Sequence, residues 1–313
     1  MQKDIDVIVL NSHGVGQVCN IKRLPYLGES LRAWNWRVED DGGKGTNVAI
    51  VLGRLGVKVA YIGKVGKDPW GDLGFKWMGE AGVDTSYMYQ DENVTTGTGL
   101  VMIDEQGRNT IVDGESSLEA LTVEEIQAGL EAMKSAKIFI TGFAMPMNLA
   151  LIGAKMAHDM GMITMCNASP LPNEPIGDLS YIDYLVINEV EAMVMAGMEE
   201  DTSKDYAEIA RKVHDIYHCG AIILTIGEEG SMVLMEDEII TNPGVKIEVA
   251  DTTGAGDSYL GAYAANMIWG KSVQECCAFA DTYAALKVTR HGTINVFPFL
   301  NEIEDFILSL KEK

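Results

Sequence analysis

The chain has 313 residues, of which 47% are hydrophobic and 22% are charged, and it contains 33 glycines. This composition excludes intrinsic disorder, and the length allows either two small domains or one large α/β unit. The formal net charge of −22 disfavours nucleic acid and anionic membrane surfaces as partners, because most of the protein surface would repel them.

The N-terminal end and the cysteines bear on the cellular location. No apolar run approaches the roughly 18 residues of a membrane span, and acidic residues precede the first short apolar run. We therefore expect neither a transmembrane helix nor a signal peptide. The five cysteines are scattered and include no C-x-x-C pair, which is typical of reduced thiols in a cytoplasmic protein.

Strand-like and helix-like segments alternate along the chain in the βαβ manner. In the first part we predict strands at Asp6–Leu10 and Val57–Ile62, and helices at Val48–Leu55 and Trp70–Ala81. After residue 120 we predict strands at Lys137–Thr141, Ile163–Asn167, Tyr184–Asn188 and Ala221–Ile226, and helices at Thr122–Lys134, Met147–Met160, Ser203–Tyr217 and Ser258–Trp269. This alternation predicts an α/β fold with a doubly wound, mostly parallel sheet flanked by helices.

Two segments interrupt the alternation, at 18–40 and 95–113. They contain strand-like runs at Leu31–Val38, Gly99–Ile103 and Asn109–Val112 without an intervening helix. The turn Asp104–Gly107 is suited to a hairpin between the last two runs. We therefore predict a small β-lobe inserted into the α/β core and packed against it.

Three segments resemble known functional motifs, but each lacks a residue that its motif requires. The run from Gly14 begins like a dinucleotide fingerprint, but Cys19 stands at the third glycine position and strand-like residues follow it. Lys44 in Gly42–Thr46 is followed by glycine rather than by the Ser or Thr of a Walker loop. His214 and His218 are four residues apart on a predicted helix, but without a third ligand we favour an exposed amphipathic helix over a zinc site.

The segment Asp251-Thr-Thr-Gly254-Ala255-Gly256-Asp257 directly precedes a predicted helix. Glycines at this place let backbone N–H groups and the helix dipole converge on an anion, with Asp257 in the first turn. A glycine-rich turn with an Asp cap is the structural alternative. An anion cradle beside a carboxylate is the arrangement that phosphoryl transfer to a hydroxyl requires.

Four motifs in order along the chain resemble those of the ribokinase-like (PfkB) carbohydrate kinase family. They are Gly42-Gly-Lys-Gly-Thr-Asn-Val-Ala49, Asn188-Glu-Val-Glu191, Leu224-Thr-Ile-Gly-Glu-Glu-Gly230 and Asp251-Thr-Thr-Gly-Ala-Gly-Asp257. The resemblance covers essentially the whole chain. It implies one ribokinase-like α/β domain over residues 1–313, with a lid over the sugar built from two inserts at about 15–41 and 95–113.

The resemblance implies a role for each matching residue. Asp257 corresponds to the general base that takes the proton from the substrate hydroxyl, and Gly254, Ala255 and Gly256 correspond to the anion hole. Asn188 and Glu191 correspond to residues that hold Mg²⁺ through water. The residues that correspond to ATP contacts are Asn188, Thr225, Gly227, Gly230, Gly256 and Asp281.

A monovalent cation is also implied. Asp251 and Thr253, with Gly292 in the later run Thr289–Gly292, correspond to a potassium site beside the anion hole. Activation by K⁺ is therefore an expectation from the resemblance.

On the acceptor side the chain departs from the family pattern. Gly14, Gly16 and Ala144 stand where ribokinases have polar sugar contacts, which argues against ribose itself and predicts a larger pocket. The remaining candidate contacts are Gly43, Lys44, Asn47 and Asp257. Asp40 and Asp41 are either solvated turn residues or, for Asp41 in particular, a replacement acceptor that would favour a polyol or an amino sugar. Trp34 and Trp36 either stack on a bulkier acceptor or close the lid over its own core.

We therefore expect an ATP- and Mg²⁺-dependent kinase that phosphorylates a hydroxyl, preferably a primary one, of a small sugar or polyol. A nucleoside kinase is the first alternative, and a catalytically silent sensor of nucleotide or sugar is the second. An exposed lid edge and the habit of the family predict a homodimer formed through the lid.

Overall fold

The computed structural model describes residues 4–106, 108–114, 116–198, 205–236 and 238–311. A nine-stranded sheet runs through the centre in the order β13-β12-β11-β10-β9-β8-β1-β4-β5. Its strands are β1 (Val7–Leu10), β4 (Val59–Gly66), β5 (Asp84–Asp91), β8 (Ile138–Gly142), β9 (Ile163–Asn167), β10 (Tyr184–Asn188), β11 (Ala221–Thr225), β12 (Gly230–Met235) and β13 (Glu238–Pro243). All neighbouring pairs are parallel except those made by β12 and β13, which confirms the predicted sheet.

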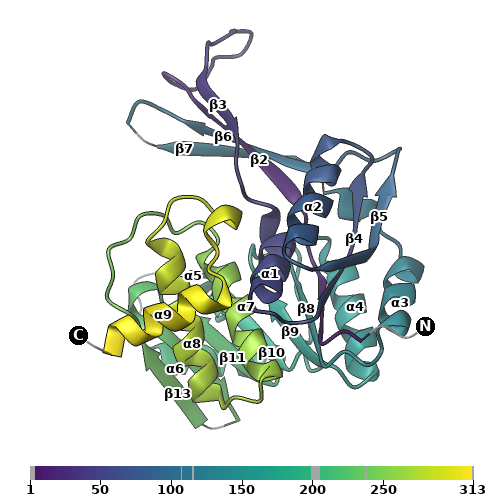
Figure 1. The fold of residues 1–313 in the computed structure, drawn as a ribbon, viewed down its shortest axis with the longest axis vertical. Helices are drawn as coiled ribbons and strands as arrows, with labels where there is room; N and C mark the ends of the chain where they lie inside the picture. Colours follow the sequence, from purple (N-terminus) through teal and green to yellow (C-terminus); the bar gives the residue numbers. More distant parts are fainter. Residues whose placement is uncertain (1–3, 107, 115, 199–204, 237, 312–313) are drawn as a thin grey trace.

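Helices cover both faces of this sheet (Figure 1). They are α1 (Gly43–Arg54), α2 (Pro69–Glu80), α3 (Val123–Ala132), α4 (Met147–Asp159), α5 (Glu189–Met195), α6 (Tyr206–Tyr217), α7 (Ala255–Ile268), α8 (Val273–Val288) and α9 (Leu300–Lys311), with short 3-10 turns η1 (Ser117–Ala120), η2 (Gly227–Glu229) and η3 (Ile294–Val296). Along β1, Ile8 and Leu10 join one apolar cluster, whereas Val7 and Val9 join the other. Successive strand residues point to opposite faces, so a sheet covered on both sides requires an uninterrupted apolar run.

The predicted elements and the observed ones differ most where glycine or polar residues weaken the pattern. The helix expected from Val48 begins at Gly43, because the glycines of its first turn carry no apolar period. Strands β5, β12 and β13 and helices α5, α8 and α9 were not predicted. For the helix predicted over Ser203–Tyr217, residues 203–204 lie outside the described residues and α6 begins at Tyr206.

A second, four-stranded sheet has the order β3-β2-β6-β7, and we call it the small sheet. It consists of β2 (Gly14–Asn20), β3 (Trp34–Val38), β6 (Gly97–Ile103) and β7 (Asn109–Asp113). Strands β6 and β7 are antiparallel, as the predicted hairpin requires, although Gly107 of its turn lies outside the described residues. The small sheet projects from the body in Figure 1 and contacts it at its base, where β2 meets α2, rather than packing along its whole length.

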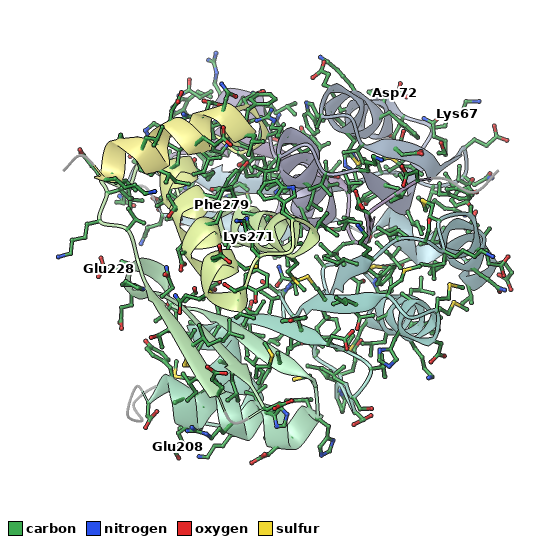
Figure 2. The ribbon with its side chains drawn as sticks, turned by 60° about the horizontal axis from the view of Figure 1, so that its bottom comes forward. Lys67, Asp72, Glu208, Glu228, Lys271 and Phe279 are labelled. Carbon is green, nitrogen blue, oxygen red and sulfur yellow. The ribbon has the colours of Figure 1, made fainter. Side chains whose placement is uncertain are left out.

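Charged side chains lie mainly at the periphery of the body, as Figure 2 shows for Lys67, Asp72 and Glu208. Within the described part of the chain, no helix has both the length and the apolar character to cross a membrane.

Candidate functional site

The segment 251–257 leads into the N-terminus of α7. Gly254 is the N-cap and has φ +72°, and a side chain there would place its Cβ 2.8 Å from Cγ2 of Thr293. Glycine is therefore required at this position. A Cβ on Gly256 would meet no atom within 4 Å, so this residue borders open space. The first turn of α7 faces that space. The backbone N–H groups of a first turn have no acceptor within the helix, and they lie at the positive end of the helix dipole.

Asp257 lies in this first turn and is 4% exposed. Its Oδ2 accepts a hydrogen bond from Nδ2 of Asn47 at 2.8 Å, and Nζ of Lys44 lies 3.9 Å from its Oδ1. Oδ1 is buried and has no hydrogen-bond partner among the residues that the structure describes. Burial raises the pKa of Asp257, while Lys44 and Asn47 oppose that shift. A buried carboxylate with one uncommitted oxygen is suited to accept a proton from a bound hydroxyl.

The glycine-rich run 42–45 positions Lys44 and Asn47. A Cβ on Gly45 would lie 2.7 Å from the carbonyl carbon of Asn11, and the N–H of Gly45 donates to the carbonyl of Ser12 at 3.0 Å. The absence of side chains thus lets the start of α1 pack directly on the loop after β1. The run serves helix packing, which agrees with the rejection of a Walker loop.

A cavity of about 370 Å³ lies in front of α7, and we call it the α7 cavity. It brings together the residues expected to bind nucleotide and magnesium and those expected to form the anion hole, namely Asn188, Glu191, Thr225, Gly227, Gly230, Gly254, Ala255, Gly256 and Asp281. Lys44 and Asp257, which are predicted acceptor contacts, line the same cavity. These residues come from the ends of β10 and β11, the starts of α1, α5, η2, β12 and α7, and the middle of α8. Most of them therefore lie at one edge of the sheet.

Asn188 and Glu191 form the capping box of α5. Oδ1 of Asn188 accepts from the N–H of Glu191 at 2.8 Å, and Oε2 of Glu191 accepts from the N–H of Asn188 at 3.0 Å. The cap holds both side chains at the wall of the α7 cavity and commits one oxygen of each. The second carboxylate oxygen of Glu191 is a hard ligand of the kind that a hydrated Mg²⁺ takes, so the donor set fits that ion.

Asp281 lies on α8 at the same cavity. Its Oδ2 accepts from the hydroxyl of Ser231 and from Nδ2 of Asn242, both at 2.7 Å. Burial raises the pKa of this carboxyl to about 6, while the two hydrogen bonds oppose the shift. Asp281 therefore ties α8 to β12 and β13, in addition to facing the cavity.

A second cavity of about 720 Å³ lies beside the small sheet, and we call it the β2 cavity. Five predicted acceptor residues line it, namely Gly14, Gly16, Asp41, Gly43 and Ala144. Its apolar wall comes from Val15, Val101, Phe143, Met145 and Pro146. Further polar groups that sequence reasoning missed are Ser12, His13, Thr98, Ser116 and Glu119. They follow no motif, so the sequence carried no signal for them.

The two glycines in β2 leave different amounts of room for a side chain. A Cβ on Gly14 would lie 3.0 Å from the carbonyl oxygen of Gly97, its partner in β6. A Cβ on Gly16 would contact the side chain of Glu39. A side chain would therefore be crowded by β6 at Gly14 but would make only an ordinary van der Waals contact at Gly16. Both glycines line the β2 cavity without supplying a polar group, and the larger pocket stays a prediction.

Asp40 and Asp41 have different roles. The carboxylate of Asp40 accepts from the N–H groups of Thr293 and Asn295, the latter at 2.9 Å, so it holds the loop after α8. The interpretation of Asp40 as a solvated turn residue is therefore wrong. Oδ1 of Asp41 accepts from Nδ2 of Asn47 at 2.8 Å and from the N–H of Gly43 at 3.0 Å. Asn47 consequently bridges Asp41 in the β2 cavity to Asp257 in the α7 cavity.

His13 lies under the β2 cavity and is 2% exposed. Nδ1 is 2.8 Å from Oγ1 of Thr46, and Nε2 is 3.1 Å from the carbonyl oxygen of Trp70. Burial lowers the pKa of His13, which favours a neutral ring that donates from Nε2 and accepts at Nδ1. Both nitrogens serve the packing of α1 and α2.

Trp34 and Trp36 lie on β3 and are 43% and 58% exposed. Nε1 of Trp36 donates to Oε1 of Gln17. Neither indole is among the residues that line the β2 cavity, so the hypothesis that they stack on the acceptor gains no support from this geometry.

The residues expected to hold a monovalent cation come together, but an amine lies among them. The carboxylate of Asp251 accepts from the N–H groups of Thr253 and Gly292. Nζ of Lys287 donates to the carbonyl oxygens of both Asp251 and Thr253. The predicted potassium site therefore does not fit these residues as they stand, because its carbonyl ligands are already occupied.

Comparison with known proteins adds independent observations. The model of a family described as pfkB family carbohydrate kinase matches residues 35–300. A deoxyribokinase from Salmonella typhi is 26% identical over 311 residues, which cover 98% of this chain and all of that protein. A ribokinase from Staphylococcus aureus is 27% identical over 304 residues, covering 95% and 98%. The structure of Arabidopsis thaliana ribokinase complexed with ribose and ATP has a TM-score of 0.87 and 26% identity, and the match covers 98% and 99% of the two chains.

Proposed function

The chain belongs to the PfkB family of carbohydrate kinases, and on that premise we propose that it transfers the γ-phosphoryl group of MgATP to a primary hydroxyl of a small, sugar-like acceptor. The nucleotide would bind in the α7 cavity and the acceptor in the β2 cavity. One observation carries this proposal: the uncommitted Oδ1 of Asp257 is buried in the first turn of α7, where the two cavities are joined through Asn47.

Each residue at this junction has a chemical task in the proposal. Asp257 accepts the proton of the attacking hydroxyl as the oxygen–phosphorus bond forms. Backbone donors of Gly254, Ala255 and Gly256 stabilise the charge on the phosphoryl oxygens. Lys44, 3.9 Å from Asp257, keeps that carboxylate ionised and adds positive charge near the phosphate. Asn47 fixes the direction of the carboxylate by donating to Oδ2.

Magnesium is the metal that the proposal includes. Asn188 and Glu191 would hold it through water at the wall of the α7 cavity, where it would neutralise phosphate charge. Potassium is left out, because Lys287 occupies the carbonyl oxygens of Asp251 and Thr253.

The lining of the β2 cavity indicates the class of acceptor. The β2 cavity combines the carboxylate of Asp41 with the apolar wall of Phe143, Met145 and Val101, and it lacks side-chain donors at Gly14 and Gly16. Where an acceptor carbon faces this apolar wall, the site discriminates weakly against a missing hydroxyl and tolerates an apolar group. This favours a sugar or polyol with a deoxygenated or substituted carbon. The same apolar wall supports a nucleoside as the second candidate.

The test is ADP release from MgATP across pentoses, deoxypentoses, hexoses, polyols, amino sugars and nucleosides, with the mass of each product checked. Turnover of free sugars or polyols would support the main proposal, and turnover of nucleosides alone would support the second candidate. A protein whose melting temperature rises with ATP but which turns over no acceptor in the panel would contradict both and favour a sensor.

We further propose a homodimer formed through the small sheet. All five residues of β3 are exposed, and Trp34, Trp36 and Val38 form an apolar edge on a sheet that projects into solvent (Figure 1). Such an edge is a template for pairing with a second copy. Light scattering should give a mass of two chains, and Trp36→Glu should shift it to one. A monomeric parent protein would contradict this part of the proposal.

A cytoplasmic location also belongs to the proposal. It is supported by the five cysteines, which are all unpaired and buried. Reduced thiols of this kind are typical of a reducing compartment, and fractionation of cells that express the tagged protein would test the assignment.

A further inference from the structure

Lys287 lies in the last turn of α8 and its side chain is fully buried. Among the charged residues that the structure describes, it has the lowest exposed fraction, at 0%. A lysine is almost never fully buried unless its ammonium group is paired, because removing the charge from water is costly. The chain therefore maintains this cation in the interior at a specific place.

The ammonium group lies at residues 251–253, which precede the anion-binding turn, by which we mean Gly254, Ala255 and Gly256. Nζ donates to the carbonyl oxygen of Asp251 at 3.1 Å and to the carbonyl oxygen of Thr253. The carboxylate of Asp251 does not pair with it directly, since its two oxygens accept from the N–H groups of Thr253 and Gly292. Lys287 is thus held by convergent backbone carbonyls with carboxylates nearby.

Convergent carbonyl oxygens are the ligands that replace the hydration shell of an alkali cation. An ammonium group is a compact point charge that makes the same contacts through its three donors. Burial lowers the pKa of Lys287, whereas the carboxylates of Asp251, Asp41, Asp40 and Asp257 oppose that shift. The four acidic neighbours would equally attract a metal cation, so the surroundings favour one positive charge at this point, whichever group supplies it.

The contact reaches the reacting groups through one peptide unit. The carbonyl of Thr253 and the N–H of Gly254 belong to the same planar trans peptide and point in opposite directions. Holding the carbonyl of Thr253 toward Lys287 therefore aims the N–H of Gly254 the other way, and Gly254 lines the α7 cavity. Lys287 also places its charge directly behind the anion-binding turn.

We propose that the ammonium group of Lys287 acts as a built-in cation that holds the anion-binding loop in its working geometry, so that the phosphoryl transfer needs no potassium ion. Lys287 is a positioning residue in this account, since it acts through the 251–254 backbone. The inference rests on the proposed kinase function for its rate measurements, but its stability measurements are independent of that function.

The first test compares the parent protein in potassium, sodium and tetramethylammonium chloride at constant ionic strength. A cation without a site has no differential binding energy to contribute, so kcat should agree within about twofold in the three salts. The melting temperature should likewise show no specific rise in K⁺. Activation of the parent protein several-fold by K⁺ over tetramethylammonium would overturn the proposal.

The second test compares two substitutions of Lys287. One leaves the space of the lysine side chain empty, and the other fills it with an uncharged side chain. Lys287→Ala removes the ammonium and opens the carbonyl pair, so kcat in tetramethylammonium should fall by about 10²-fold, a loss typical of a disturbed oxyanion donor. Potassium should restore at least about a tenth of the lost activity and raise the melting temperature of this variant, because a ligand that binds only the folded state stabilises it. Lys287→Met keeps the volume, so it should lose activity without rescue.

A matched control is Lys271→Ala, since Lys271 precedes the same helix but is exposed (Figure 2). It should leave rate, melting temperature and cation response unchanged. If Lys287→Ala were as active as the parent protein in tetramethylammonium, the proposal would be wrong. If no acceptor were turned over at all, the proposed function would fail, but a K⁺-specific rise in melting temperature confined to Lys287→Ala would still support the cation replacement. The absence of that rise would contradict it.

Discussion

The α7 cavity and the β2 cavity are linked by Asn47, which donates to Asp257 of the first and to Asp41 of the second, yet they are built in different ways. The α7 cavity is lined by short local motifs in which glycine geometry and helix N-termini supply the polar groups. The β2 cavity takes side chains from β2, β6, the turn before η1 and the loop after β8. Backbone donors leave a readable pattern in a sequence, whereas side chains gathered from distant segments do not.

Asp257 lines the α7 cavity and is linked through Asn47 to Asp41 of the β2 cavity, so its substitution should have the largest effect. Asp257→Asn keeps an oxygen to accept from Asn47 but cannot accept the proton of the hydroxyl. We expect kcat to fall by about 10²- to 10⁴-fold, with KM for ATP changed by less than about threefold. Steady-state kinetics test this, and an unchanged or higher melting temperature serves as the control for folding. A loss smaller than about tenfold would remove Asp257 as the base.

Gly254 and Gly256 test the geometry of the α7 cavity, because they lie two residues apart at the start of α7 but differ in the space left for a side chain. Gly254→Ala forces a side chain into a left-handed conformation and against Thr293, at a cost of about 1–2 kcal/mol for the conformation alone. We expect a lower melting temperature and a loss of about 10- to 100-fold in kcat. Gly256→Ala meets no neighbour within 4 Å, so it should leave stability unchanged and raise KM for ATP. Equal melting temperatures for the two variants would contradict this geometry.

Asp41 probes the β2 cavity alone. Asp41→Asn retains an oxygen for the bonds from Asn47 and Gly43 but removes the charge that faces the acceptor. KM for the acceptor should rise about tenfold, as for the loss of one charged hydrogen bond, while KM for ATP stays constant. The matched change Asp40→Asn should lower the melting temperature without changing either KM, because Asp40 holds the 293–295 loop. An unchanged acceptor KM in Asp41→Asn would exclude Asp41 as a contact.

Lys44 tests the electrostatic coupling across the junction. Lys44 lowers the pKa of Asp257 against the larger effect of burial, so Lys44→Met should raise that pKa further. Because the carboxylate must be ionised to accept a proton, turnover falls as pH decreases through this pKa, and the acidic limb of the rate profile should move to higher pH. At neutral pH we expect about a tenfold loss. The profile of Lys58→Met, at an exposed pair with Asp4, should not move. A limb that stayed in place in Lys44→Met would show that the two groups are not coupled.

Asp281 should give the smallest effect on turnover but a visible one on stability. Burial raises its pKa to about 6, so its protonated form stabilises the fold below the ordinary Asp value and this contribution is lost as pH rises through 6. Asp281→Asn keeps an acceptor for Ser231 and Asn242 and removes this dependence. Between about pH 4 and pH 8 the free energy of unfolding of the parent protein should fall by up to about 3 kcal/mol more than that of the variant. Urea titrations at several pH values measure this difference, and identical pH profiles would exclude a raised pKa.

The sequence predicted the features that depend on local patterns, and it missed those that depend on contacts between distant segments. Six strands of the central sheet, β1, β4 and β8 to β11, were predicted within about four residues, since a sheet covered on both faces leaves continuous apolar runs such as Val7–Leu10. The anion-binding turn was also found, because Gly254 is required by its φ of +72° and by the contact with Thr293. Strand β13 was missed because it lies at the edge of the sheet, is only partly buried and carries a weak apolar pattern.

The sequence by itself therefore determined the α/β layers, the family and the residues of the anion-binding turn, because these depend on local periodicity and on conformations that only glycine adopts. The tertiary structure alone decided which of the two neighbouring carboxylates faces the β2 cavity. It commits Asp40 to the 293–295 loop and leaves Asp41 at the β2 cavity. It also decided the fate of the predicted potassium site, by bringing Lys287 from the far end of α8 onto the carbonyl oxygens of Asp251 and Thr253. Contacts between residues more than thirty positions apart depend on how helices pack, and no local sequence pattern predicts them.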